Sequence, residues 1–240
     1  MPNNYFKFKQ FTVYQDQCAM KVCTDACLFG AWAADYNLQP VVHRLLDIGT
    51  GTGLLSLMLA QKLPDVIMDA VEIDEAAAQQ AKENFEASPW KERLNVYNTS
   101  IQQFAETTAH KYDIIICNPP FYENDLKSGD AKRNLALHSA ELRLGQLIAA
   151  ADTLLNDGGR FFALLPYFRT EEFEALIDGK FFVREKALVK QSGMHDYFRS
   201  MFLLTKQEGS PVFSEMSIMN EDGNYTEAFV GLLQTYYLKL

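Results

Sequence analysis

Residues 45–54 read LLDIGTGTGL, and this stretch decides the fold. Its first four residues suit a buried strand, which enters a glycine turn with the spacing G-x-G-x-G and then a helical pattern. A dinucleotide-binding turn would carry its third glycine at position 54, where this chain has Leu54. The turn instead suits S-adenosylmethionine, which has no phosphate and whose methionyl carboxylate and sulfonium would lie against the glycine backbone. A side chain at Gly49 or Gly51 would meet this ligand or strain the backbone. We therefore expect a site for this cofactor that includes Asp47, Gly49, Gly51 and Gly53.

From Leu45 onward, short apolar runs alternate with helical patterns, which is typical of a parallel sheet buried on both faces. The runs predict strands at Leu45–Ile48, Met68–Val71, Leu94–Tyr97, Tyr112–Cys117, Arg160–Leu165, Phe181–Val189 and Ser200–Lys206. The intervening segments predict helices at Gly53–Leu63, Glu75–Ala87, Ala140–Leu155 and Glu171–Ile177, the last three with Asp74, Ser139 and Thr170 as N-caps.

The last two predicted strands are joined by residues 191–199, which are too few for a helical crossover. This pair should therefore be an antiparallel hairpin. No repeat, low-complexity tract or linker interrupts the chain. The sequence predicts one α/β domain over residues 1–240: a doubly wound, mostly parallel sheet of seven strands with one antiparallel strand, the Rossmann-like arrangement of class I methyltransferases.

Composition narrows the class of protein. No apolar run approaches the roughly 18 residues that span a bilayer, and no secretory signal begins the chain, so we expect a soluble, cytoplasmic protein without a membrane partner. We also expect a monomer, although no sequence feature decides the oligomeric state. The four cysteines lack metal-ligand spacing, so no metal is expected. The formal net charge is −9, yet residues 180–206, which include Lys186 and Lys190, hold six basic residues against two acidic ones. With residues 1–21 they could form a basic face, or they could be an ordinary solvated run.

Two further elements should complete the cofactor site. Glu72 follows the second predicted strand, 19 residues after Gly53, where a carboxylate can accept both ribose hydroxyl protons. Ser100, with the backbone N–H of Ile101, follows the third strand and is our candidate for the adenine amino group of the cofactor. An N-cap role for the short helix that begins there accounts for Ser100 equally well.

The candidate catalytic motif is Asn118-Pro119-Pro120-Phe121, directly after the fourth predicted strand. Two consecutive prolines remove two N–H donors and leave outward carbonyls beside the Asn118 side-chain oxygen. Such acceptors suit a substrate with an NH2 group whose lone pair is delocalised into a planar π-system. Held by two acceptors, the nitrogen can turn its lone pair toward a sulfonium methyl, while Phe121 stacks on the planar group.

The motif resembles the [DNS]-P-P-[YFW] signature of the amino-methyltransferases, whose substrates are nucleic-acid bases or the glutamine of release factors. The stretches around Phe6–Phe11 and Cys18–Trp32, with others along most of the chain, look like the bacterial tRNA1(Val) adenine-N6 methyltransferase family. This resemblance implies tRNA as partner, N6 of the adenine next to the anticodon as target, and S-adenosylmethionine as cofactor. It also implies that Lys9, Gln10, Phe11 and residues 21–25, including Lys21 and Thr24, cover the cofactor and flank the substrate.

The physical interpretation of these flanking segments is less specific. Thr24 can N-cap a helix through Ala34, and aromatics interleaved with lysines at residues 6–11 can bind RNA or simply pack on the sheet. Tyr122, Lys132 and Arg133 lie in a polar loop after the motif and are candidates for substrate contact, although a solvated loop explains each singly.

Two kinds of alternative remain open: an N-methyltransferase of another NH2 substrate, either a ribosomal RNA base or a release-factor glutamine, and a non-catalytic cofactor-binding interaction module. A release-factor glutamine methyltransferase would need a helical domain before the glycine turn, and only 44 residues precede Leu45. A non-catalytic cofactor-binding module would not need an intact Asn118 motif.

Overall fold

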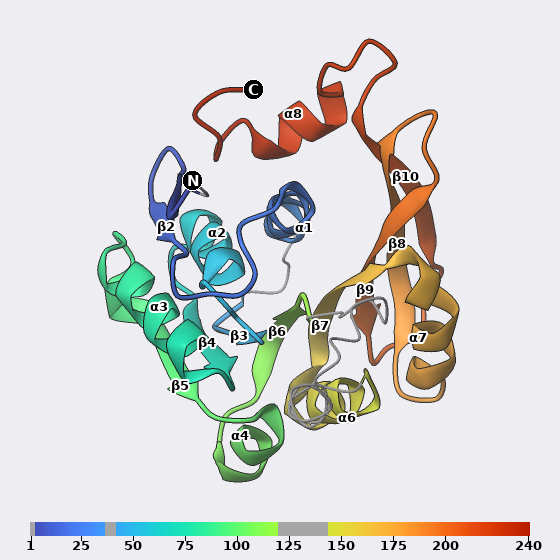
Figure 1. The fold of residues 1–240 in the computed structure, drawn as a ribbon. Helices are drawn as coiled ribbons and strands as arrows, with labels where there is room; N and C mark the ends of the chain where they lie inside the picture. The colour runs from blue at the N-terminus through green and yellow to red at the C-terminus, as the bar shows by residue number, and fades with distance from the viewer. Residues whose placement is uncertain (1–2, 37–41, 120–143) are drawn as a thin grey trace, which may run out of the picture.

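The computed structural model describes residues 3–36, 42–119 and 144–240. Its centre is an eight-stranded sheet in the order β10-β8-β9-β7-β6-β3-β4-β5 (Figure 1). The strands are β3 (Arg44–Ile48), β4 (Ile67–Glu72), β5 (Leu94–Asn98), β6 (Tyr112–Cys117), β7 (Leu155–Pro166), β8 (Phe182–Ser192), β9 (Tyr197–Thr205) and β10 (Val212–Met219). The order in which the chain adds strands reverses between the neighbours β3 and β6: β4 and β5 extend the sheet on one side, and β7 extends it on the other. Ligands bind at such a switch point in open α/β sheets.

The strand directions confirm the predicted architecture. β3 to β7 are parallel, and β9 is antiparallel to both β7 and β8, as the short 191–199 connection required. The sheet has eight strands rather than seven, because β10 adds to β8 in parallel at the edge. The sequence did not predict β10, since most of its residues are exposed or half-buried and form no continuous apolar run.

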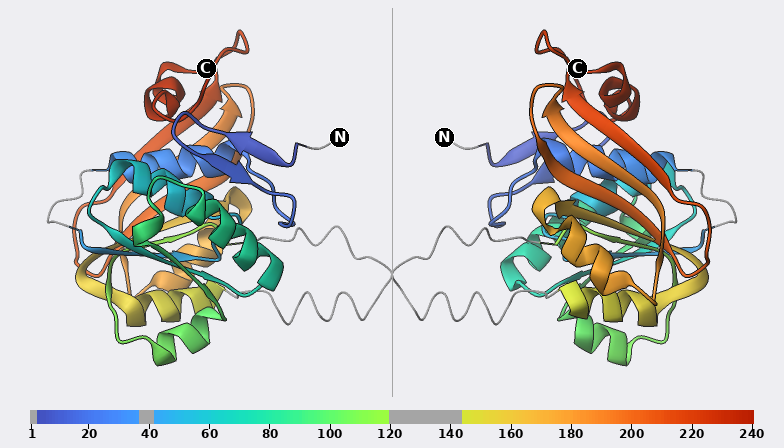
Figure 2. Two further views of the ribbon diagram at one scale, coloured as in Figure 1. Left: turned by 90° about the vertical axis from the view of Figure 1, so that its left-hand side faces the viewer. Right: turned by 90° about the vertical axis from the view of Figure 1, so that its right-hand side faces the viewer.

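Helices cover both faces of this sheet (Figures 1 and 2). Successive strand residues alternate between two cores: Leu45 packs into one and Leu46 into the other. The first core holds α1 (Thr24–Asp35), α2 (Leu54–Lys62), α3 (Glu75–Glu86) and α8 (Glu227–Leu233), and the second holds α4 (Ile101–Thr107), α6 (Leu144–Leu154) and α7 (Thr170–Ile177). The structure also contains two short 3-10 turns, η1 (Lys91–Arg93) and η2 (Tyr167–Arg169).

The predicted helix caps have mixed outcomes. Asp74 caps α3, since its Oδ1 accepts a hydrogen bond from Ala77 N at 2.8 Å. Thr24 and Thr170 were wrong as caps: both are first residues of their helices, and Cys23 and Arg169 precede them without a side-chain cap bond. Thr170 instead pairs its hydroxyl with Ser200 Oγ at 2.7 Å, which joins α7 to β9. Ser139 lies outside the described residues.

The N-terminal segment forms a small hairpin, β1 (Tyr5–Lys7) with β2 (Thr12–Tyr14), that packs against α3 and the C-terminal segment. Asn84 of α3 exchanges two hydrogen bonds with the backbone of Tyr14, at 2.9 and 2.8 Å, and Gln80 accepts one from Gln17 N. These amide contacts hold residues 14–17 over the end of β4. No described helix is long and apolar enough to cross a membrane.

Candidate active site at the carboxyl edge of the sheet

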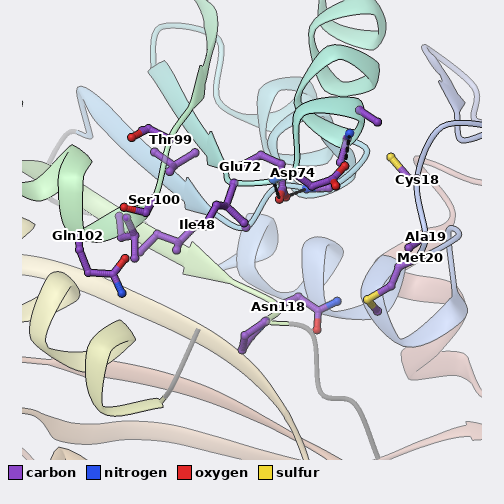
Figure 3. A pocket seen from close by; sticks show the side chains of 18 of the residues that line it. Cys18, Ala19, Met20, Ile48, Glu72, Asp74, Thr99, Ser100, Gln102 and Asn118 are labelled. Atoms are coloured by element: carbon purple, nitrogen blue, oxygen red, sulfur yellow. Dashed lines mark hydrogen bonds between the residues drawn. The ribbon is translucent and has the colours of Figure 1, made fainter. Parts of the chain in front are cut away.

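A cavity of about 500 Å3 opens at the carboxyl ends of β3, β4, β5 and β6 (Figure 3). Small-molecule sites in proteins typically have this size and this place in an α/β sheet. Three kinds of segment line it: strand ends, the first residues of helices, and a loop from the N-terminal segment. The lining residues that carry the argument are Met20, Gly49, Gly51, Glu72, Ser100 and Asn118.

The glycine turn after β3 forms the floor of this cavity. Gly49, Gly51 and Gly53 all have left-handed backbone conformations, with φ of 70°, 54° and 81°. Their roles nevertheless differ. A Cβ atom at Gly49 or Gly51 would meet nothing within 4 Å, and both residues line the cavity, so the missing side chains leave room for a ligand. A Cβ at Gly53 would lie 2.5 Å from Phe85 Cε1, so this glycine serves the packing of α2 against α3.

Glu72, at the end of β4, is fixed in the cavity wall by two backbone donors. Its Oε2 accepts a hydrogen bond from Gly51 N at 2.9 Å and its Oε1 accepts one from Asp74 N at 3.0 Å. Each carboxylate oxygen keeps a further lone pair. The carboxylate is therefore held without a side-chain partner and can accept a pair of hydroxyl protons from a ligand, as a ribose would offer.

The charge of the wall favours a cationic ligand. Of the described residues that line the cavity, Glu72 and Asp74 are acidic and none is lysine, arginine or histidine. Burial, together with the charge of Glu72, raises the pKa of Cys18 to about 11, so this lining thiol stays neutral. A pyrophosphate would meet uncompensated carboxylates here, whereas S-adenosylmethionine carries a positive sulfonium. The donor set thus fits S-adenosylmethionine better than a dinucleotide.

Asn118 and Pro119 follow β6 and line the same cavity, with Asn118 half-buried. Figure 3 shows the Asn118 amide below the turn of Glu72 and Asp74. β6 is hydrogen-bonded to β3 with Cys117 opposite Ile48, so Asn118 and Gly49 leave neighbouring strands at the same level. The acceptors of the motif and the glycine turn therefore face one space. Pro120 and Phe121 lie outside the described residues.

Ser100 has the N-cap role that the sequence indicated, and it also lines the cavity. Its Oγ accepts a hydrogen bond from Gln103 N at 3.2 Å, which makes it the N-cap of α4. Ser100 and Ile101 also line the cavity, beside Thr99 and Gln102. The cap fixes the hydroxyl at the cavity rim, where it can still donate its proton to a ligand.

Asp47 does not line the cavity. Its Oδ2 accepts hydrogen bonds from the hydroxyls of Thr50 and Ser56 at 2.7 and 2.8 Å, and burial raises its pKa to about 6. Asp47 therefore shapes the glycine turn from behind. Neither Asp47 nor Gly53 lines the cavity, and the cofactor contact expected for these two residues stays a prediction.

The predicted covering residues are also placed differently. Lys21 donates to the Gln15 carbonyl, Lys9 donates to the Gln234 carbonyl at 2.6 Å, and neither they nor Thr24 line the cavity. Gln10 is exposed, and Phe11 is only 6% exposed and stacks on Phe8 in the core. The sequence missed the lining segment itself, which is Gln17, Cys18, Ala19 and Met20. This segment is held in place by Gln80 and Asn84 of α3. These residues are distant in sequence, so no local pattern indicates the contact.

The basic residues proposed for RNA contact are mostly paired. Lys186 Nζ lies 2.7 Å from Glu174 Oε1, and Lys190 Nζ lies 3.2 Å from Glu215 Oε2. Neither lysine lines the cavity, and their partners reduce the basic field expected from residues 180–206. Tyr122, Lys132 and Arg133 lie outside the described residues. No cluster of metal-binding side chains occurs within the described ranges.

Comparisons with known proteins agree with this geometry. Residues 34–181 match the methyltransferase small domain family. The tRNA1(Val) (adenine(37)-N6)-methyltransferase of Christiangramia forsetii is 41% identical over the full length of both chains, and that of Flavobacterium psychrophilum is 39% identical over 98% of this chain and all of its own. The chain belongs to the tRNA1(Val) (adenine(37)-N6)-methyltransferase family. Its cofactor is accordingly S-adenosylmethionine.

Solved structures confirm the fold of this methyltransferase at low sequence identity. A predicted O-methyltransferase from Agrobacterium tumefaciens superposes with a TM-score of 0.69 and 17% identity, covering 88% of this chain and 96% of its own. TrmN from Thermus thermophilus gives a TM-score of 0.56 and 21% identity over 75% of this chain and 48% of its own. The Rossmann-like class I architecture predicted from the sequence is confirmed.

Proposed function

We propose that this methyltransferase transfers a methyl group to N6 of adenine 37 of tRNA1(Val). One observation carries the proposal: Asn118 and Pro119, the acceptors of the catalytic motif, line the same cavity as Gly49, Gly51 and Glu72. The names of the full-length relatives supply the target nucleotide. Two acceptors in the lining suit an amino nitrogen. Each can hold one of its N–H bonds, and the lone pair of the nitrogen can then point at the methyl group.

S-adenosylmethionine, when bound, supplies a methyl group on a cationic sulfur. Gly49 and Gly51 would leave room for it, Glu72 would accept its ribose hydroxyl protons, and Ser100 with Ile101 would meet its adenine ring. Asn118 Oδ1 and the Pro119 carbonyl each accept one N–H of the substrate amino group and so hold the nitrogen with its lone pair toward the methyl. No general base is needed, because the methylated nitrogen is acidic and releases its proton to water.

Further parts of the proposal concern the protein as a whole. We take residues 1–240 to work as a single domain, because the two cores share one sheet. We also propose that the enzyme acts as a monomer in the cytoplasm, where its tRNA substrate occurs. Pro120 and Phe121 complete the motif by fixing the backbone and stacking on the base.

The test is a methylation assay with labelled S-adenosylmethionine and unmodified tRNA1(Val) transcript, followed by nuclease digestion and mass spectrometry. We expect N6-methyladenosine at position 37, and no product with a transcript that carries guanine there. Asn118→Ala should lower the rate about 100-fold or more, by analogy with the loss of one positioned hydrogen-bonding group. Its cofactor dissociation constant, measured by calorimetry, should change less than about twofold.

Two outcomes would contradict this assignment. If a release factor is methylated and tRNA is not, the enzyme uses the same acceptors on a glutamine amide. If Asn118→Ala loses cofactor affinity as much as it loses rate, Asn118 holds the cofactor and not the substrate.

A further inference from the structure

Exposed aromatic and thioether side chains gather where β7, β8 and β9 meet the carboxyl edge of the sheet. Phe168 is 71% exposed and Met194 is 81% exposed, and Tyr167 is 40% exposed. Tyr197, which begins β9, is half-buried, and its ring centroid lies 5.2 Å from that of Tyr167. We call these four residues the aromatic rim. Large apolar side chains exposed together on one surface usually mark a binding site.

The rim lies beside the catalytic motif. Cys117 of β6 is paired with Ala163 of β7, so Asn118 is level with Leu164, and Tyr167 follows three residues later. With about 3.3 Å per residue and about 4.8 Å between strands, the Tyr167 backbone lies about 11 Å from that of Asn118. β8 ends at this same edge, since it is antiparallel to β9, and the β8–β9 turn carries Met194 there.

The rim is held in place by the fold beneath it. The buried Thr170–Ser200 hydroxyl pair ties the start of α7 to β9, and the Arg169 guanidinium makes two hydrogen bonds to the Glu172 carboxylate at 2.8 and 2.7 Å. Phe168 lies on η2, directly before the residues that make these two contacts. An exposed aromatic ring on a fixed turn can stack on a partner with little loss of conformational freedom.

The charges around the rim are compensated. Lys190 lies 4.3 Å from the Tyr197 ring centroid and pairs with Glu215, while Arg199, opposite Pro166 in the sheet, pairs with Asp25 at 2.7 Å. The rim therefore offers ring faces rather than unpaired cations. Such a surface suits stacking of nucleobases better than contact with phosphates.

We propose that the aromatic rim binds the bases of single-stranded RNA next to the target nucleotide. This inference rests on the proposed function. A base can enter the cavity only after it leaves its stack, and its neighbours then lose a stacking partner. The aromatic rim lies at the same carboxyl edge of the sheet as the cavity. Its rings replace the stacking partner that the neighbouring bases have lost. Phe168, the most exposed ring, is a positioning residue for the RNA and not a catalytic one.

The test compares Phe168→Ala with Phe182→Ala. Phe182 is 42% exposed at the opposite edge of the same sheet, so it is a matched control. For Phe168→Ala we expect the dissociation constant for an anticodon stem-loop RNA, and the KM for tRNA, to rise about fivefold to a hundredfold, the range for one stacked base. The kcat and the cofactor dissociation constant should change less than about twofold, and Phe182→Ala should resemble wild type.

Three further measurements separate stacking from other roles. Phe168→Trp should restore RNA affinity and Phe168→Leu should not. The ratio of the dissociation constants of Phe168→Ala and wild type should stay constant between about 50 and 200 mM salt, because stacking releases no counterions. The inference would be overturned by any of three results. The two alanine variants could bind RNA equally well, or the ratio of dissociation constants could depend on salt. Wild type could also form a dimer that Phe168→Ala dissociates. Failure of wild type to methylate tRNA would overturn the proposed function, while the binding comparison still tests the rim.

Discussion

Gly53 is the position in the glycine turn where an added methyl group should affect folding more than binding. Its φ is 81°, and a Cβ would lie 2.5 Å from the ring of Phe85, which is 2% exposed in the core. A left-handed conformation costs an alanine about 1–2 kcal/mol, and overpacking a core costs about 1–3 kcal/mol. We therefore expect Gly53→Ala to lower the free energy of unfolding by about 2–5 kcal/mol.

Gly51→Ala is the matched comparison. Its φ is 54°, yet a Cβ there meets nothing within 4 Å, so only the conformational cost of about 1–2 kcal/mol applies. The methyl group would enter the cavity, and we expect the cofactor dissociation constant to rise about tenfold or more, or about 1.4 kcal/mol. Urea unfolding followed by circular dichroism gives the stabilities, and calorimetry gives the affinities. If the two variants are equally stable, the contact with Phe85 does not constrain the turn as the structure indicates.

Three further changes test other parts of the site. Glu72→Gln should weaken cofactor binding about tenfold in calorimetry, because one of its two backbone N–H partners would then face an amide NH2; an unchanged affinity would remove Glu72 from the site. Burial raises the pKa of Asp47 from 3.8 to about 6, so the folded state holds a proton that the unfolded chain releases, and stability from this group falls as the pH rises from about 4 to about 6. Asp47→Asn should therefore gain stability relative to wild type across that window, and a pH-independent difference in unfolding free energy would contradict the assignment. Lys186 is paired with Glu174, so we do not expect it to contact a phosphate. Lys186→Ala should therefore leave the slope of log K against log salt for RNA binding nearly unchanged, whereas loss of a phosphate contact would make that slope shallower by about 1.

Much of the fold could be predicted because its signals are local. The strand at Leu45–Ile48, the glycine turn and the Asp74 cap each depend on residues close in sequence, and each is found where the pattern indicated. β10 could not be found in this way. β10 pairs with β8 on one side only, at the edge of the sheet, so its sequence contains no continuous buried run. Its position is a tertiary feature: β9 ends opposite the start of β8, and from there the chain can return alongside β8.

The cofactor side of the cavity was predictable for the same reason, since Gly49, Gly51 and Glu72 follow strands that the periodicity reveals. The covering segment was not. Residues 17–20 reach the cavity because side chains of α3 bind the backbone at Tyr14 and Gln17, which lie 70 and 63 residues away in sequence. Aromatic–basic interleaving at residues 6–11 left RNA binding and packing on the sheet both open, and the structure places Phe11 in the core, stacked on Phe8.

The cationic cofactor and the proposed tRNA substrate impose opposite demands on one sheet edge. The carboxylates of Glu72 and Asp74, at the end of β4, suit the cationic cofactor, but they would repel phosphates brought close to them. The strand order resolves this conflict by distance: β6 separates the cofactor side from β7 and β9, where the exposed rings lie. With a net charge of −9 and its described rim cations paired, the protein gains little from counterion release on that side. Its RNA affinity should therefore depend on stacking more than is usual for enzymes that act on tRNA, and the salt dependence of binding should be shallow.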